Sequence, residues 1–237
     1  MRSKLLVWAL FVMMVAWMGG ATSTVRADDV EEQELIESLL ERSEQLLQKM
    51  IEEPDAQNMA VLMQRAHGVA IFPSVIKVGF GIGGLMGDGL LMERDAVGNW
   101  HGPGFMDIRG LSYGWQAGFQ SIGMVLIITS EEGMDSFRSG NIKVGGDASF
   151  AIGPWGRSGE ISTDLELESA IYGYSIAQGA FLGISFSGSD IRVVPSLNEA
   201  YWGEFESSRT LFEQPANDPR VLPLVEALKQ FMDVHVN

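Results

Sequence analysis

The feature that most constrains the fold is a glycine-rich stretch at residues 77–94, which reads KVGFGIGGLMGDGLLMER. Its glycines recur at every second position at Gly79, Gly81 and Gly83, and Gly84 follows. Alternation is the period of a β-strand, so one face of this strand would carry almost only hydrogen atoms. A strand retains several glycines where another segment lies close to its backbone, or where the sheet bends sharply. We therefore predict that these four glycines are structural.

The same stretch is typical of a hairpin. Gly87 and Gly89 flank Asp88 as in a turn, and Leu90 begins an apolar return strand. The spacing also matches the GxGxxG fingerprint of dinucleotide-binding proteins. That fingerprint requires a strand that leads into a helix, and the glycines that follow Gly84 disfavour a helix. We predict no nucleotide site and no cofactor.

Hydrophobic periodicity predicts helices at both ends of the chain. Apolar residues recur with helical spacing over 28–53, over 54–66 and again from residue 218. Between these segments, about eight short apolar runs alternate with turn residues, as in antiparallel sheets. The predicted fold class is α+β. We expect a strongly curved, mainly antiparallel β-sheet, or a barrel-like sandwich of about eight strands, flanked by N-terminal and C-terminal helices.

Residues 1–27 have the composition of a secretory signal peptide. Arg2 and Lys4 precede an uncharged apolar run, and small residues lead to Ala27. The run is shorter than the roughly 20 residues that cross a bilayer, which favours cleavage near Ala27 over retention as a membrane anchor. Because the chain has no cysteine, it lacks the lipid-modified residue of a bacterial lipoprotein. We expect an exported protein, periplasmic or extracellular.

The predicted organisation follows from these segments. After the signal peptide, one domain spans residues 28–203. It consists of N-terminal helices over 28–66 and a glycine-rich β core over 67–203. A linker and a C-terminal helix occupy 204–237.

The charge balance excludes some partners. The net charge of −15 becomes −18 after residues 1–27 are removed, because three basic residues and no acid are lost. Nucleic acid is therefore not expected as a partner, since its binding depends on neutralising phosphates. Electrostatic adsorption to an anionic bilayer is disfavoured for the same reason.

The sequence offers little catalytic chemistry. The chain has three histidines and no cysteine, and no GxSxG or HExxH motif is present. Its many carboxylates are explained by an acidic surface. We predict no catalytic residues, no metal site and no enzymatic activity.

Two aromatic segments are candidate lipid contacts. Trp100 and Phe105 lie in a segment that we expect to be an irregular loop, and Trp155 lies in a turn beside Arg157. Exposed aromatic rings in loops suit a membrane interface, and an arginine suits a lipid headgroup. The alternative is that these rings cover the open ends of the sheet.

A series of motifs extends from Ala66 to Gly203. The segments are AHGVAIFP at 66–73, GFGIGG at 79–84, NWHGPGF at 99–105, SYGWQAG at 112–118, GGDASFAIGPWGR at 145–157, YGYSIAQGAFLGISFSGS at 172–189, and Asn198 with Tyr201, Trp202 and Gly203. In content and order they resemble the SYLF domain family, a lipid-binding family of bacteria and eukaryotes. The resemblance covers well over half of the chain.

The resemblance implies a protein that associates with lipids and has no catalytic residues. Eukaryotic members bind phosphoinositides, and some bind and bundle actin filaments, through a basic or amphipathic N-terminal segment. Here a signal peptide and an acidic helix occupy that position, which argues against phosphoinositide and actin binding. We expect a non-enzymatic lipid- or membrane-associating protein of the bacterial cell envelope. The alternatives are an envelope scaffold that binds protein partners through its acidic surface, and a hydrolase with an unrecognised site.

Overall fold

The structure is a computed structural model that describes residues 27–53, 56–144, 150–152, 170–177, 180–182 and 188–234. The chain divides into two units, residues 1–31 and 32–237. The side-chain contacts discussed below lie within the second unit.

The described residues form five α-helices and one 3-10 helix. The helices are α2 (Ala27–Ile51), α3 (Ala56–Gln64), α4 (Glu131–Arg138), α5 (Pro195–Trp202) and α6 (Leu222–Met232), with η1 (Thr210–Glu213) between the last two. The predicted helices near both ends of the chain are confirmed. Helix α5 was not predicted, because eight residues give too short an apolar pattern to distinguish a helix from a loop.

The strands form one mainly antiparallel sheet, as predicted. They are β1 (Gly68–Arg94), β2 (Trp100–Ile128), β3 (Asn141–Lys143), β4 (Phe150–Ile152), β5 (Ile171–Ala177), β6 (Ala180–Leu182) and β7 (Ser189–Val193). The order is β3-β7-β2-β5-β4, with β1 paired to β2 and β6 paired to β5. Only the β4–β5 pair is parallel among the described strands.

Strands β1 and β2 form a hairpin of unusual length. They pair from Gly68 opposite Ile128 to Arg94 opposite Trp100, and residues 95–99 make the turn. Gly98 has a φ of 94° there, a conformation that glycine adopts without strain. The predicted reversal at Gly87 and Gly89 is wrong, since both residues lie inside β1. We call this paired β1–β2 element the ribbon.

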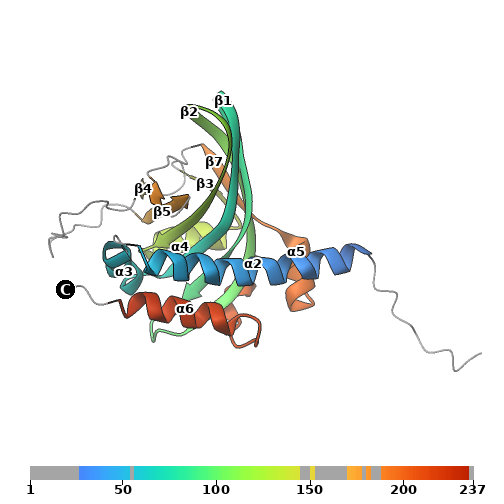
Figure 1. Cartoon of the computed structure of the whole chain (residues 1–237). Helices are drawn as coiled ribbons and strands as arrows, with labels where there is room; N and C mark the ends of the chain where they lie inside the picture. The colour runs from blue at the N-terminus through green and yellow to red at the C-terminus, as the bar shows by residue number, and fades with distance from the viewer. Residues whose placement is uncertain are drawn as a thin grey trace, which may run out of the picture. The chain divides into compact units, whose positions relative to one another are not determined.

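The glycines of β1 serve a different purpose: they let the ribbon fold back on itself. The pairing register shifts between Phe80 and Gly81, and β1 bends there. A Cβ atom added to Gly87 would lie 2.6 Å from the carbonyl oxygen of Ser74. Beyond the bend, the second half of β1 therefore lies directly against the first half. Figure 1 shows both strands running to this bend at the top of the view.

Gly83 and Gly89 show the same close approach. A Cβ atom on Gly83 would collide with the carbonyl of Val78, and one on Gly89 with the carbonyl of Ile71. The two residues of each facing pair lie at about equal distances along the sequence on either side of residue 80, as expected for a single fold-back there. Backbone can approach backbone this closely only where the side chain is absent.

The folded ribbon has an apolar cluster on each face. One cluster packs Val69, Ile71 and Met92 against helices α2, α3, α5 and α6. The other lies on the opposite face and includes Ala70, Phe72 and residues of α4 and β7. Successive residues of β1 therefore point into different clusters, as strand alternation requires.

A buried asparagine attaches helix α5 to the ribbon. Asn198 Nδ2 donates to the carbonyl oxygens of Phe105 and Val194 at 2.9 and 2.8 Å. Its Oδ1 accepts from the Phe105 backbone N–H at 2.9 Å. The side chain is fully buried. Because both of its polar atoms have hydrogen-bond partners, the free-energy cost of burying the amide is offset.

Candidate functional site

Large apolar side chains are exposed near the bend of the ribbon. Phe119 is 70% exposed, Met86 is 60% exposed and Val78 is 52% exposed. The other exposed large apolar side chains in the described part of the chain are Val30, Val97 and Leu222. These three lie on separate elements. Among the residues whose exposure the structure describes, such side chains gather near the bend alone.

The three side chains near the bend share one surface. Val78 and Phe119 are cross-strand partners, and cross-strand partners point to the same face of a sheet. Ile76, two residues before Val78, therefore also points to that face. Ile76 and Met86 line the same cleft, so the surface continues from one half of β1 to the other. We call Val78, Met86 and Phe119 the apolar patch.

A cleft adjoins the apolar patch and has a volume of about 450 Å³. Helix α2 forms one wall and the two halves of the ribbon form the rest. The lining residues are Leu35, Leu39, Arg42, Pro73, Ser74, Ile76, Met86, Gly87, Asp88, Asp107, Ile108 and Arg109. Met86 belongs to both the patch and the cleft. The cleft therefore opens onto the apolar surface.

The charged groups of the cleft face each other across the ribbon. Asp88 and Asp107 are cross-strand partners. Asp107 is 8% exposed, and its Oδ2 forms an ion pair with Nη2 of Arg109 at a distance of 2.7 Å. Its Oδ1 is buried and has no hydrogen-bond partner among the described residues. A buried carboxylate oxygen without a donor costs free energy, so it marks a place where a donor would bind favourably.

Asp88 is perturbed by the same surroundings. Partial burial and the negative charge of Asp107 raise the pKa of the Asp88 carboxyl, while Arg109 opposes the shift. A carboxyl group with a raised pKa beside a second carboxylate in a cleft is a feature of functional sites. The cleft thus combines two acids, two arginines and an apolar wall.

The predicted lipid contacts lie elsewhere. Trp100 is 4% exposed and Phe105 is fully buried, and both belong to the cluster beneath the helices. The expectation of an exposed irregular loop at 100–105 is wrong, because these residues form the start of β2. Their rings pack inside the protein. Trp155 and Arg157 lie outside the described residues and remain predictions.

The four predicted structural glycines lie at the fold-back of β1. Gly83 lies against Gly79, and Gly81 follows the register shift. Gly84 differs, because a Cβ atom there would meet only the carbonyl oxygen of Gly110, at 4.0 Å. Space alone therefore does not require glycine at position 84.

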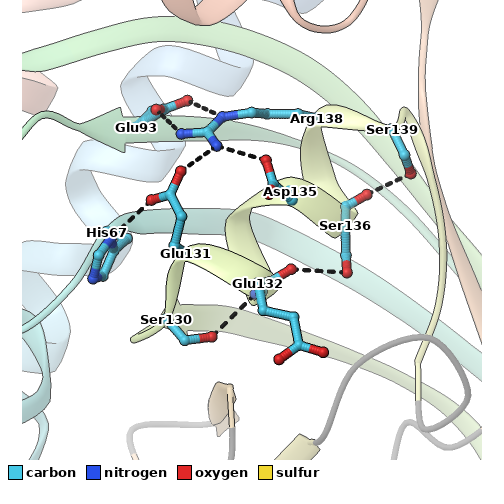
Figure 2. Close-up of polar contacts among 10 residues, drawn as sticks. His67, Glu93, Ser130, Glu131, Glu132, Asp135, Ser136, Arg138 and Ser139 are labelled. Carbon is cyan, nitrogen blue, oxygen red and sulfur yellow. Dashed lines mark hydrogen bonds and ion pairs between the residues drawn. The ribbon is translucent and has the colours of Figure 1, made fainter.

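A second polar cluster surrounds Arg138 (Figure 2). Its guanidinium donates to both carboxylate oxygens of Glu93, and its Nη1 donates to Glu131 and Asp135 at 2.5 and 2.8 Å. His67 Nδ1 lies 3.2 Å from Glu131. Hydrogen bonding to Glu93 raises the pKa of Arg138, and hydrogen bonding from Arg138 lowers that of Glu131.

The Arg138 cluster joins helix α4 to the end of β1. The guanidinium already meets three carboxylates, and Arg138 is largely buried. These bonds use four of the five N–H donors of the guanidinium, and its charge is already matched by carboxylates. We assign this cluster a structural role.

No group of three or more His, Asp or Glu side chains in the described ranges has metal-binding geometry. None of the described helices is long and apolar enough to cross a bilayer.

The sequence analysis missed the apolar patch and the cleft. Val78 and Phe119 each sit in an alternating strand pattern, which does not distinguish a covered face from an open one. Asp88 was assigned to a turn. The signal that could have found it is an acid within an apolar strand, since acids are depleted from strands.

Comparisons with known proteins identify a family for this chain. A model of the Ysc84 family, described as "Las17-binding protein actin regulator", matches residues 109–231. Protein YSC84 of Saccharomyces cerevisiae is 33% identical over 166 residues, which cover 67% of this chain and 35% of the yeast protein. SH3 domain-containing YSC84-like protein 1 of Xenopus laevis is 30% identical over 175 residues, covering 73% of this chain and 52% of the relative.

The human protein of the same name is 29% identical over 186 residues, covering 78% of this chain and 54% of the relative. The chain thus spans about half the length of these relatives, or less. The resemblance inferred from the sequence motifs is confirmed: this chain belongs to the Ysc84 family, the family of the SYLF domain.

Proposed function

We propose that this chain is a non-enzymatic protein that associates with lipid membranes through the bend of its ribbon. The observation that carries the proposal is the apolar patch of Val78, Met86 and Phe119, which is exposed on one surface. Isolated exposed apolar residues are ordinary, but a contiguous group at one site marks an interaction surface. An aromatic ring flanked by aliphatic side chains is well suited to the bilayer interface.

Electrostatics favour an apolar mode of binding. The chain has a net charge of −15, so an anionic bilayer repels it at long range. Helix α2 carries many glutamates, unlike amphipathic membrane-binding helices, which are rich in Lys and Arg. Contact through the patch does not require charge attraction, because its free energy comes from the apolar area that is buried in the bilayer.

We further propose that the protein acts in the cell envelope after export. The support is the signal-like composition of residues 1–27. The expected mature N-terminus, near Asp28, coincides with the start of α2 at Ala27. Trp155 and Arg157 remain candidates for additional lipid contact.

Vesicle co-sedimentation tests the proposal. We expect V78S/F119S to bind phosphatidylcholine vesicles about tenfold more weakly than the wild type, since two apolar side chains no longer enter the interface. The matched control is V97S, which removes a valine that is more exposed than Val78, 84% against 52%, from the hairpin turn at residues 95–99. Binding should persist at about 0.5 M salt, where charge-driven contacts are screened.

Two results would reject membrane association through the patch. One is equal binding by V78S/F119S and V97S. The other is loss of wild-type binding at high salt. Thermal melting of each variant shows whether a change in binding reflects unfolding.

A second candidate function is binding of a protein partner through an acidic groove. Glu37, Glu41 and Glu44 of α2 line a cleft with Pro223 and Leu224 of α6. The family description names a protein partner, Las17, and actin regulation. Binding through this groove would weaken steeply with salt, which separates it from apolar membrane contact.

A further inference from the structure

The cleft beside the apolar patch contains groups that patch-only membrane contact does not use. It holds two carboxylates, Asp88 and Asp107, and two guanidinium groups, Arg42 and Arg109. Leu35, Leu39 and Ile76 form an apolar wall in the same cleft. A ligand that fits must satisfy both charge signs and lie against hydrocarbon.

Single-charge ligands fit poorly. A phosphate alone would pair with the arginines but would lie beside the two carboxylates, in a chain that is already strongly acidic. A bare divalent cation would pair with the carboxylates but would be repelled by Arg109, which lies 2.7 Å from Asp107. A zwitterion that carries both a phosphate and an ammonium group matches the cleft.

The type of ammonium follows from Asp107. Its Oδ1 is buried and accepts no hydrogen bond from the described residues, so a bound group that donates an N–H would be stabilised there. A primary ammonium has three N–H donors, whereas a trimethylammonium has none. Asp88, across the strand pair, offers a second acceptor for the same ammonium.

The position of the cleft indicates where the ligand comes from. Met86 lines the cleft and also belongs to the apolar patch. If the patch rests on a bilayer, the cleft opens at the level of the lipid headgroups.

We propose that the cleft binds the headgroup of a phospholipid with a primary ammonium, that is, an ethanolamine-type headgroup. The phosphate lies toward Arg42 and Arg109, and the ammonium lies toward Asp88 and Asp107. The inference rests on the proposed membrane association and adds a preference among lipids.

Vesicles of three compositions test the preference. They contain phosphatidylcholine alone, phosphatidylcholine with phosphatidylethanolamine, or phosphatidylcholine with phosphatidylglycerol. We expect the wild-type chain to bind the ethanolamine-containing vesicles at least about fivefold more tightly than the other two, because one or two charge-assisted hydrogen bonds are gained.

Variants connect the preference to the cleft. D88N and D107N should each abolish the preference, so that the ethanolamine-containing vesicles are bound no more tightly than phosphatidylcholine alone. Asp88 is more exposed than Asp107, so D88N reports on binding even if D107N fails to fold. The matched control is D218N, which removes another aspartate paired with an arginine, Arg220, and should keep the preference because neither residue lines the cleft.

The outcomes separate the inference from the proposed function. Equal binding to all three vesicles, or a preference for phosphatidylglycerol, overturns the headgroup site and leaves membrane association standing. A preference that D88N and D107N both retain also overturns the site. If no vesicle binds, the proposed function fails, and soluble glycerophosphoethanolamine then tests the cleft alone by NMR titration. Binding of that compound that D88N abolishes supports the cleft, and no binding overturns it.

Discussion

The folded ribbon has the turn at residues 95–99 at one end and the bend near residue 80 at the other, and the two ends differ in how well their side chains are covered. At the turn, the Asp95 carboxylate accepts hydrogen bonds from the backbone N–H groups of Val97 and Asn99 and from the side chain of Asn99. Burial alone would raise the pKa of Asp95, but these bonds and one with His101 lower it to about 2. Near the turn, Phe105 packs edge-to-face on Tyr201, with ring centroids 5.4 Å apart.

Near the bend, the large apolar side chains are exposed instead of packed. Phe119 is exposed, as is its cross-strand partner Val78. The cleft beneath them retains a carboxylate oxygen without a donor. At the turn, the protein's own groups supply the hydrogen bonds and the packing. At the bend, apolar side chains and a carboxylate oxygen are left for a partner to contact.

The difference shows that residue type does not decide whether an aromatic side chain is buried or exposed in this fold. Phe105 and Phe119 lie on the same strand, β2. Phe105 is covered because α5 packs over it and Asn198 binds its backbone at both N–H and C=O. At Phe119 the described structure provides no such cover, and the ring is 70% exposed.

The largest expected effect comes from exchanging these two rings for alanine. F105A should lower the free energy of unfolding by about 3–5 kcal/mol, because it leaves a cavity in a packed cluster. F119A should change the free energy of unfolding by less than about 0.5 kcal/mol, because its ring is already in water. Chemical denaturation of both variants measures the difference. Similar losses in the two variants would remove the distinction between the two ends.

A smaller effect is expected where the ribbon folds back. G87A should destabilise the protein by about 1–3 kcal/mol, because the new Cβ atom would lie 2.6 Å from the carbonyl oxygen of Ser74. The matched control is G84A in the same strand, where the nearest group, the carbonyl oxygen of Gly110, is 4.0 Å away. G84A should be neutral or slightly stabilising, since alanine loses less backbone entropy than glycine. If the two variants melt alike, the halves of the ribbon are not in close contact.

Much of the fold followed from the sequence because it depends on local pattern. The helices near both ends and the curved antiparallel sheet each have a periodic signal. Alternating glycines correctly indicated close approach or a sharp bend. They did not reveal that β1 continues through Gly87 and Gly89, because a turn and a fold-back both require glycine there.

The candidate site was harder to predict because it depends on which elements cover which face. Trp100 and Phe105 were placed in a loop since Gly102, Pro103 and Gly104 interrupt the strand pattern. The structure shows that β2 continues through them. The pairing of Asp88 with Asp107 depends on a register that spans 19 residues, and no local pattern encodes that register.

The central claim is that the bend of the ribbon, and not its turn, enters the membrane. The chain has no cysteine, so a single introduced cysteine can be labelled uniquely. We would place an environment-sensitive fluorophore at position 119 in one variant (F119C) and at position 97 in the other (V97C), and record emission as vesicles are added. We expect a blue shift, and quenching by brominated lipid, at position 119 but not at position 97. A blue shift at position 97 alone, or at neither position while the protein co-sediments with vesicles, would contradict it.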